Sequence, residues 1–204
     1  MRTVTMMGFG DSARRGQFEI VGELWSLNDC YAVTYIDAEE PDTLKRGLDF
    51  NAVFELHESN YVTRCQPRNP RFIKKTHRQW LATLPPTCPV FMREHDPMIP
   101  QSIPFPFADI YEYFKLGPQF FRGTPSYMLA FALMLGIRRI RIIGFDQNDA
   151  EHREQRPFFV FWLGIGKGMG CSFDGVLSFL DAPENDEGLA DLQPAREQAT
   201  TKGG

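Results

Sequence analysis

The segment 123–146, "GTPSYMLAFALMLGIRRIRIIGFD", constrains the fold more than any other part of the sequence. Thr124 is a good N-cap, and Pro125 suits the first helical position. Gly136 then provides a stop, so the pattern predicts a helix that ends there. The middle of this helix is apolar almost all round, which predicts that it is buried. The β-branched run at 137–143 predicts a strand. A buried helix that leads directly into a strand is typical of α/β proteins.

Further apolar runs predict the remaining strands and helices. The predicted strands are Thr3–Met7, Ile20–Leu27, about Ala52–Leu56, about Pro89–Met92 and about Cys171–Phe173. The predicted helices are Lys74–Leu84, Phe107–Phe114 and an apolar segment at 156–170, whose glycines disfavour a regular helix. Strands that alternate with helices indicate an α/β fold, a Rossmann-like three-layer sandwich with a mainly parallel sheet and helices on both faces.

The domain organisation follows from the length and from a change in composition near residue 183. A chain of 204 residues, 43% of them hydrophobic, is sufficient for one domain with a substantial core, which we predict over 1–182. The segment 183–204 has few large apolar residues and is predicted to be a flexible tail. The segment 93–123 combines prolines and glycines with phenylalanines. A lid over a site and a proline-ordered surface wrap are both open for it.

Charge, hydropathy and cysteine spacing exclude several classes of protein. The net charge of −4 argues against broad, sequence-blind binding of nucleic acid. No apolar run approaches the roughly 20 residues that span a bilayer, and the N-terminus lacks the layout of a signal peptide. Cys30, Cys65, Cys88 and Cys171 lie far apart with no CxxC pair. This spacing predicts reduced, mostly structural thiols in a cytoplasmic protein.

The turn "GFGDS" at residues 8–12 directly follows the first predicted strand. Gly8 and Gly10 allow positive φ angles and close approach of a ligand, and exposed amides at such a turn can hold a phosphate. Ser12 adds a hydroxyl group, although the full GxGxxG pattern is absent because Ala13 occupies its last position. A phosphate-binding turn and a plain strand turn are both compatible with this pattern.

Polar residues also end the next two strands. Asn28 ends the second, and its amide suits a sugar hydroxyl or the edge of a base. A turn-forming Asn–Asp pair is the alternative. In "FELHES", Glu55 and His57 share one face of the third strand. His57 lies near the end of that strand, where a general base, a substrate contact and a structural histidine are all open.

The region around the strongest strand supplies further candidates. Thr124 opens a helix whose free amides and partial positive charge attract phosphate or carboxylate. Asp146 follows the strand and is a candidate for ribose hydroxyls. Asp146 and Asp149 could also share Mg²⁺, which we do not favour because a DxxD pair is nonspecific. His152 and Arg156 add an acid–base group and a cation that suits phosphate.

These residues are expected to converge, because the carboxyl ends of parallel strands meet at one edge of a sheet and ligands bind there in doubly wound folds. The residues predicted at that edge are Gly8, Gly10, Asn28, His57, Thr124 and Asp146. Their shared location, more than any single motif, predicts a binding hollow lined with amides and hydroxyls.

The order of these motifs resembles that of the Rossmann-like bacterial sialyltransferases, which use CMP-sialic acid. The counterparts in this chain are "GFGDS" at 8–12, Asn28 and the segment 123–146. Phe9 and Asp11 depart from the turn of that family, and no residue after His152 matches its catalytic histidine. The resemblance implies a Rossmann-like fold and a pocket for a CMP-linked donor, held by Gly8, Gly10, Ser12, Asn28 and Thr124.

We therefore predict a Rossmann-like domain that binds a nucleotide or nucleotide-sugar in the cytoplasm of a bacterium or a phage-infected cell. In the leading hypothesis it is glycosyltransferase-like: His57 or His152 deprotonates an acceptor hydroxyl, and Arg156 stabilises the leaving phosphate. The sequence is also similar to MptE-like pyrophosphokinases and to small phage proteins. A Mg²⁺-dependent pyrophosphoryl transferase and a non-catalytic phage accessory protein are therefore alternatives. A modified DNA base is one candidate acceptor; the acceptor, the donor base and the oligomeric state are left open.

Overall fold

The structure, a computed structural model, describes residues 2–10, 13, 20–28, 49–58, 76–145 and 150–175, without the side chains of 150–152. The boundaries proposed near residue 182 lie outside these residues and stay predictions.

The described strands form one seven-stranded sheet in which every pair of neighbours is parallel. The strand order is β5-β4-β3-β2-β1-β6-β7. The predicted α/β fold with a mainly parallel sheet is confirmed. The strands are β1 (Thr3–Met7), β2 (Glu23–Leu27), β3 (Ala52–Glu55), β4 (Val90–Met92), β5 (Ser102–Pro104), β6 (Arg139–Ile143) and β7 (Ser172–Gly175).

The direction in which the strands are added reverses at β1. β2 pairs with one side of β1, where Met7 aligns with Ser26, and β6 pairs with the other side, where Met7 aligns with Ile143. In doubly wound sheets the crevice for a ligand lies outside the carboxyl ends of the strands at such a switch point. The topology therefore directs attention to the residues that follow β1, β2 and β6.

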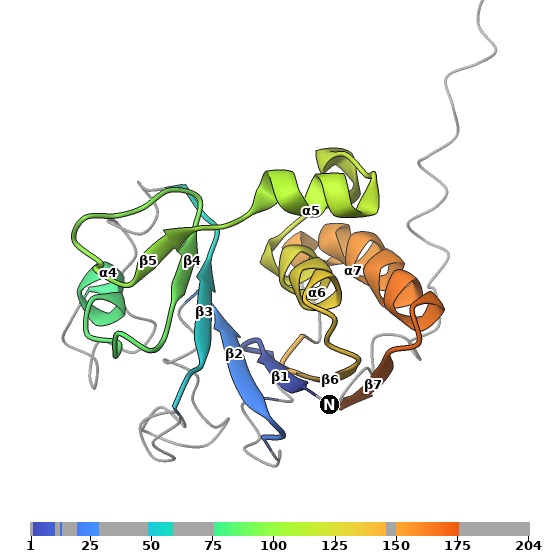
Figure 1. The fold of residues 1–204 in the computed structure, drawn as a ribbon, viewed down its shortest axis with the longest axis horizontal. Helices are drawn as coiled ribbons and strands as arrows, with labels where there is room; N and C mark the ends of the chain where they lie inside the picture. Colours follow the sequence, from blue (N-terminus) through green and yellow to red (C-terminus); the bar gives the residue numbers. More distant parts are fainter. Residues whose placement is uncertain are drawn as a thin grey trace, which may run out of the picture.

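Helices cover both faces of the sheet in the described part of the chain (Figure 1). α5, α6 and α7 lie on one face, and α4 lies beside β4 and β5 on the other. Right-handed crossovers explain this arrangement, because the β3–β4 and β5–β6 connections run in opposite directions across the sheet. No described helix is long and apolar enough to cross a bilayer. The helices are α4 (His77–Leu81), α5 (Phe107–Phe114), the 3₁₀ helix η2 (Pro118–Phe120), α6 (Thr124–Met134) and α7 (Ala150–Gly168).

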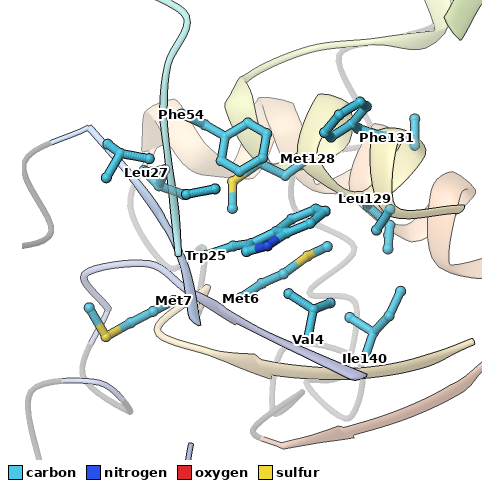
Figure 2. Close-up of a cluster of buried hydrophobic side chains, with 14 of the residues drawn as sticks. Val4, Met6, Met7, Trp25, Leu27, Phe54, Met128, Leu129, Phe131 and Ile140 are labelled. Carbon is cyan, nitrogen blue, oxygen red and sulfur yellow. The ribbon is translucent and has the colours of Figure 1, made fainter. Parts of the chain in front are cut away.

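One cluster of the core lies between the sheet and α6, as Figure 2 shows. The ring of Trp25 on β2 is 5.3 Å from that of Phe54 on β3 and 5.8 Å from that of Phe131 on α6. Met128 and Leu129 are also fully buried. The prediction that this helix is buried on nearly every side is therefore confirmed. α6 packs directly on one face of the sheet and covers it.

Several boundaries differ from the predicted ones. β2 begins at Glu23 rather than at residue 20, because Gly22 has a φ of 74° and bends the chain against Thr3. α7 begins at Ala150 and runs through Pro157 and its glycines, although regular helix was disfavoured there. Burial of Trp162 in the core outweighs these local preferences.

β5 was not predicted, because Pro104 lies within it and Pro100 and Pro106 flank it. It is an edge strand of three residues. The amide of Ser102 donates to the carbonyl of Ile99 at 2.8 Å, and the amide of Phe105 donates to Met92 on β4 at 2.6 Å. Prolines are compatible with an edge strand, since one side of its backbone has no neighbour.

The described cysteines are structural, as predicted. Cys88 and Cys171 are buried free thiols. Burial raises the pKa of the Cys88 thiol to about 11, so it stays protonated and unreactive at neutral pH. Cys30 and Cys65 lie outside the described residues.

Candidate functional site

The ends of β1 and β6 meet at the switch point through glycine backbones. The Gly8 amide donates to the carbonyl of Ile143 and the Gly10 amide to that of Gly144, both at 2.8 Å. A Cβ added at Gly8 would lie 2.2 Å from the Gly144 carbonyl oxygen. Glycine at position 8 is therefore required by the close contact between the segments that follow β1 and β6. Because both amides already have acceptors, they do not supply the phosphate donors predicted for this turn.

Asn28 lies beyond the end of β2, at the same edge. Its amide donates to the carbonyl of Phe54 at 2.9 Å, which holds the residue beside β3. Its φ is 46°, a left-handed conformation that asparagine tolerates better than most residues. Its side-chain oxygen is buried, and no described group donates a hydrogen bond to it. A buried acceptor of this kind is suited to an N–H or O–H donor from a ligand.

Glu55 ends β3 and binds two histidines. Its Oε1 lies 2.5 Å from Nδ1 of His57, and its Oε2 lies 2.6 Å from Nε2 of His77. The predicted sharing of a strand face by Glu55 and His57 is thus realised as a direct contact. His77, the first residue of α4, was not singled out in the sequence, because only the tertiary fold brings α4 to the end of β3.

The charge of Glu55 depends on those two contacts. Burial alone would raise the pKa of the Glu55 carboxyl, since its side chain has no exposed surface. Hydrogen bonds from His57 and His77 act in the opposite direction and dominate, lowering the pKa to about 2. Glu55 is therefore an ionised carboxylate at neutral pH. The His57 side chain is 37% exposed, so it lies between this buried charge and solvent.

The start of α6 lies next to the first turns of α7. Gly123, with a φ of 76°, is the N-cap, and Thr124 is the first helical residue rather than the cap predicted for it. No side chain caps this helix start. A Cβ at Gly123 would lie 2.0 Å from the side-chain oxygen of Gln155, one residue before Arg156. Arg156 therefore lies on the part of α7 that adjoins the Thr124 helix start.

Two features of this edge were missed in the sequence. Arg93 directly follows β4, and its Nε donates to the carbonyl of Leu56 at 2.7 Å, next to His57. The Tyr127 hydroxyl lies 3.1 Å from that of Tyr111. Burial, and then this contact, raises the pKa of Tyr127, so the phenol stays protonated. The position of Arg93 after a predicted strand was a usable signal; the tyrosine pair, on separate helices, had none.

The remaining predicted residues are not placed. Ser12, Asp146 and Asp149 lie outside the described residues, as does the side chain of His152 on α7. Within the described part of the chain, no group of three histidine, cysteine or acidic side chains is arranged to hold a metal ion. In the Glu55 cluster the histidine nitrogens face carboxylate oxygens rather than a common centre.

The comparisons with known proteins find similar solved structures, two of which are of one enzyme. No protein-family model matches the sequence, and no curated protein sequence matches it. The chain is similar to the sialyltransferase CstII from Campylobacter jejuni in complex with the substrate analogue cytidine-5'-monophosphate. The TM-score is 0.47 and the identity 15%, over 86% of this chain and 79% of that chain. A second structure of that enzyme, with CMP-3FNeuAc, matches with a TM-score of 0.47 and 15% identity over 86% of this chain and 80% of the other. At this level of similarity, functional assignment depends on the residues of the sheet edge.

Proposed function

We propose that this chain is a glycosyltransferase-like enzyme that binds a nucleotide-sugar and transfers the sugar to an acceptor hydroxyl. The proposal is supported by polar side chains at one edge of a parallel sheet, next to its switch point. It is also supported by the order of sequence motifs that resembles the CMP-sialic acid-using sialyltransferases. Fold class alone does not favour this function over others.

The observation that carries the proposal is the buried, unfilled acceptor of Asn28. Its side-chain oxygen receives no hydrogen bond from any described residue, at an edge where a ligand is expected. A ribose hydroxyl or the exocyclic amino group of cytosine would supply the missing donor. Leaving a buried acceptor without a donor costs about 1–3 kcal/mol, so a ligand that satisfies it gains affinity.

The other residues have these roles in the proposal. Gly10, in the turn after β1, lets a nucleotide approach closely, with Ser12 contributing a hydroxyl, whereas Gly8 supports the turn by packing against Gly144. The phosphate lies near the start of α6 at Thr124, because the free amides of a helix N-terminus attract anions. A guanidinium, that of Arg156 or of Arg93, stabilises the phosphate as it leaves. Asp146 contacts the ribose.

His57 is the proposed general base, and His152 is the second candidate. His57 adjoins the carboxyl edge and is partly exposed, so it can reach an acceptor hydroxyl. The donor is proposed to be CMP-linked. The pyrophosphoryl alternative would require Asp146 and Asp149, which lie outside the described residues, to hold Mg²⁺.

The test replaces Asn28 by glycine. Glycine accepts the positive φ of this residue and removes only the side-chain amide. Calorimetric titration with CMP, CMP-linked sugars, UDP-sugars and ATP, with and without Mg²⁺, identifies the nucleotide. We expect a cytidine nucleotide to bind, and Asn28→Gly to weaken that binding by about tenfold or more.

Asn51→Ala is the matched control. The Asn51 side-chain oxygen accepts from the Leu24 amide at 2.7 Å, before β3 begins, so it is an asparagine with a purely structural bond. We expect this variant to lose stability by about 1 kcal/mol and to bind nucleotide as the wild type does. Equal affinity in wild type and Asn28→Gly, or binding only of ATP with Mg²⁺, would contradict the proposal.

A further inference from the structure

The contacts of Glu55 define where the protons of two histidines lie. An ionised carboxylate accepts hydrogen bonds and donates none. Nδ1 of His57, at 2.5 Å, and Nε2 of His77, at 2.6 Å, must therefore both carry a proton. In their neutral forms, the two histidines are therefore in opposite tautomers: Nδ1–H in His57 and Nε2–H in His77. The second ring nitrogen of His57 then has the lone pair.

The cluster is rigid on its buried side. Glu55 and His77 have no exposed side-chain surface, whereas His57 is 37% exposed. The backbone amide of His57 also donates to Oε1 of Glu55, at 3.2 Å. Glu55 is thus held from one side by His77 of α4 and from the other by His57, two residues after the end of β3. Only one member of the cluster can meet a ligand.

We propose that Glu55 and His77 are positioning residues that fix His57 in the Nδ1–H tautomer, so that its Nε2 takes the proton of the acceptor hydroxyl. This inference rests on the proposed function. The acceptor O–H bond breaks and its proton passes to Nε2 of His57. The acceptor oxygen forms a bond to the anomeric carbon of the donor. The bond between that carbon and the phosphate oxygen breaks, and the nucleotide leaves with the electron pair.

The buried charge has a second effect on this step. When His57 gains a proton it becomes an imidazolium directly against the Glu55 carboxylate. Opposite charges at this separation attract strongly where water is excluded. The carboxylate therefore stabilises the charge that forms during transfer, in addition to orienting the ring. His77 supports this role by binding the other carboxylate oxygen, so that Glu55 does not turn away from His57.

The first experiment measures tautomers in the unmodified protein. Long-range ¹⁵N–¹H correlation spectra at about pH 8, above the range in which histidine ordinarily titrates, distinguish protonated from unprotonated ring nitrogens. The chain has four histidines, which single His→Asn variants assign. We expect Nδ1–H for His57 and Nε2–H for His77. An Nε2–H tautomer of His57, or an even mixture, would overturn the proposal.

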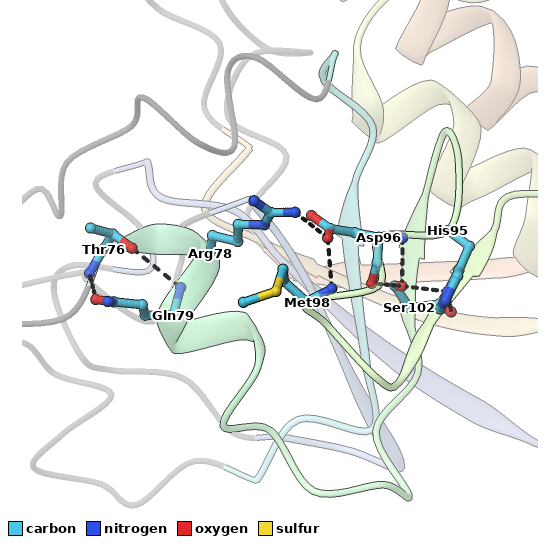
Figure 3. Close-up of polar contacts among 7 residues, drawn as sticks. All are labelled: Thr76, Arg78, Gln79, His95, Asp96, Met98 and Ser102. Atoms are coloured by element: carbon cyan, nitrogen blue, oxygen red, sulfur yellow. Dashed lines mark hydrogen bonds and ion pairs between the residues drawn. The ribbon is translucent and has the colours of Figure 1, made fainter.

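His95 is an internal reference in the same spectra. Its Nδ1 lies 3.0 Å from the carbonyl oxygen of Ser102, in a polar network that also contains Asp96 (Figure 3). This fixes a tautomer without Glu55. In Glu55→Ala we expect His57 to shift toward the Nε2–H tautomer while His95 is unchanged. If Glu55→Ala does not fold, as judged by circular dichroism, the wild-type tautomers alone decide.

The kinetic experiment uses Glu55→Gln, which keeps an acceptor oxygen for His57 but removes the charge. We expect kcat for sugar transfer to fall by about 100-fold or more. The nucleotide Kd from calorimetry should stay within a factor of two of the wild-type value. Unchanged kcat would overturn the proposal, and so would a change in KM alone.

The failure of the inference and that of the proposed function can be distinguished. If the nucleotide-sugar binds and reacts but His57 has the other tautomer, the positioning role is wrong and the function stands. If the tautomers are as expected but no nucleotide-sugar binds, the proposed function is wrong. The role of His57 as base is then overturned with it.

Discussion

Single glycines determine how the strands end at the switch point. Gly8 and Gly144 approach so closely that a Cβ on either would lie within 2.4 Å of the other residue's carbonyl oxygen. Gly144 also has a φ of 72°, which favours glycine. In the sequence, the glycines of this turn resemble a phosphate-binding pattern. In the structure, Gly8 must be glycine because it packs against the backbone of Gly144.

We predict that Gly8→Ala lowers the free energy of unfolding by about 2 kcal/mol or more, because the added Cβ would overlap backbone that cannot move without breaking the sheet. Gly164→Ala is the control. Gly164 lies within α7 with nothing within 4 Å of an added Cβ. Alanine should therefore stabilise the helix by about 0.5–1 kcal/mol. Urea denaturation of both variants checks this, and equal effects would refute the steric explanation.

The candidate site residues show which features of such a site can be predicted from single positions in the sequence. Asn28 and His57 were predicted because each follows an apolar strand. The proximity of His77 to Glu55 could not be predicted, since these residues are separated by 22 positions in the chain and meet only when α4 packs on the sheet. The sequence also could not show that the Gly8 and Gly10 amides are unavailable to a phosphate, because their acceptors, Ile143 and Gly144, lie at the end of β6 and just after it.

At the scale of elements, α4 has a capping box that fixes the position of His77. The Thr76 side chain accepts from the Gln79 amide at 3.3 Å, and the Gln79 side chain accepts from the Thr76 amide at 3.0 Å (Figure 3). These bonds satisfy amides at the start of a helix of only five residues. Because His77 is the first residue of that helix, the capping box also holds the His77 ring against the Glu55 carboxylate.

We predict that Thr76→Ala destabilises the protein by about 1 kcal/mol, whereas Thr76→Ser, which keeps the hydroxyl, stays close to wild type. Urea denaturation measures the difference. The same spectra that report the His77 tautomer should show a broadened His77 signal in Thr76→Ala only. If alanine and serine give the same stability, the capping box makes no net contribution.

The elements with strong local patterns were the most predictable. α6 has an apolar surface on every side and a terminal glycine, and its start was found within one residue. β5 was missed because its prolines oppose strand formation, and an edge position removes that objection. α7 was predicted too short because Pro157 and several glycines argue locally against helix, whereas the core contacts of Trp162 and Phe159 determine its conformation.

At the scale of the whole molecule, one buried carboxylate makes stability depend on pH. The pKa of Glu55 is about 2 in the folded chain against an ordinary value of 4.5. A depressed pKa stabilises the folded state above the ordinary value, and this contribution is lost as the pH falls through the folded value. The affected window therefore runs from about pH 4.5 down to about 2. The facing groups are His57 and His77, with Arg93 bound to the adjacent carbonyl.

We predict that wild type exceeds Glu55→Gln in unfolding free energy by roughly 3 kcal/mol near neutral pH, and that this difference shrinks as the pH falls through that window. Urea denaturation at several pH values measures it. Glu94→Gln, at an exposed carboxylate after β4, is the matched control. If the difference in unfolding free energy between wild type and Glu55→Gln stays constant down to about pH 2, the two histidines do not lower the pKa of Glu55 in the folded protein.

The outer side of β5 has a consequence for how copies of this molecule behave at high concentration. The backbone amide of Ser102 is already bonded to Ile99, and Pro104 has no N–H at all. The row of donors with which a foreign strand would pair is therefore missing, even though Ile103 presents an apolar side chain to water. The outer edge of β5 therefore does not favour pairing with a strand of another molecule, so the sheet does not extend into a fibril on this side.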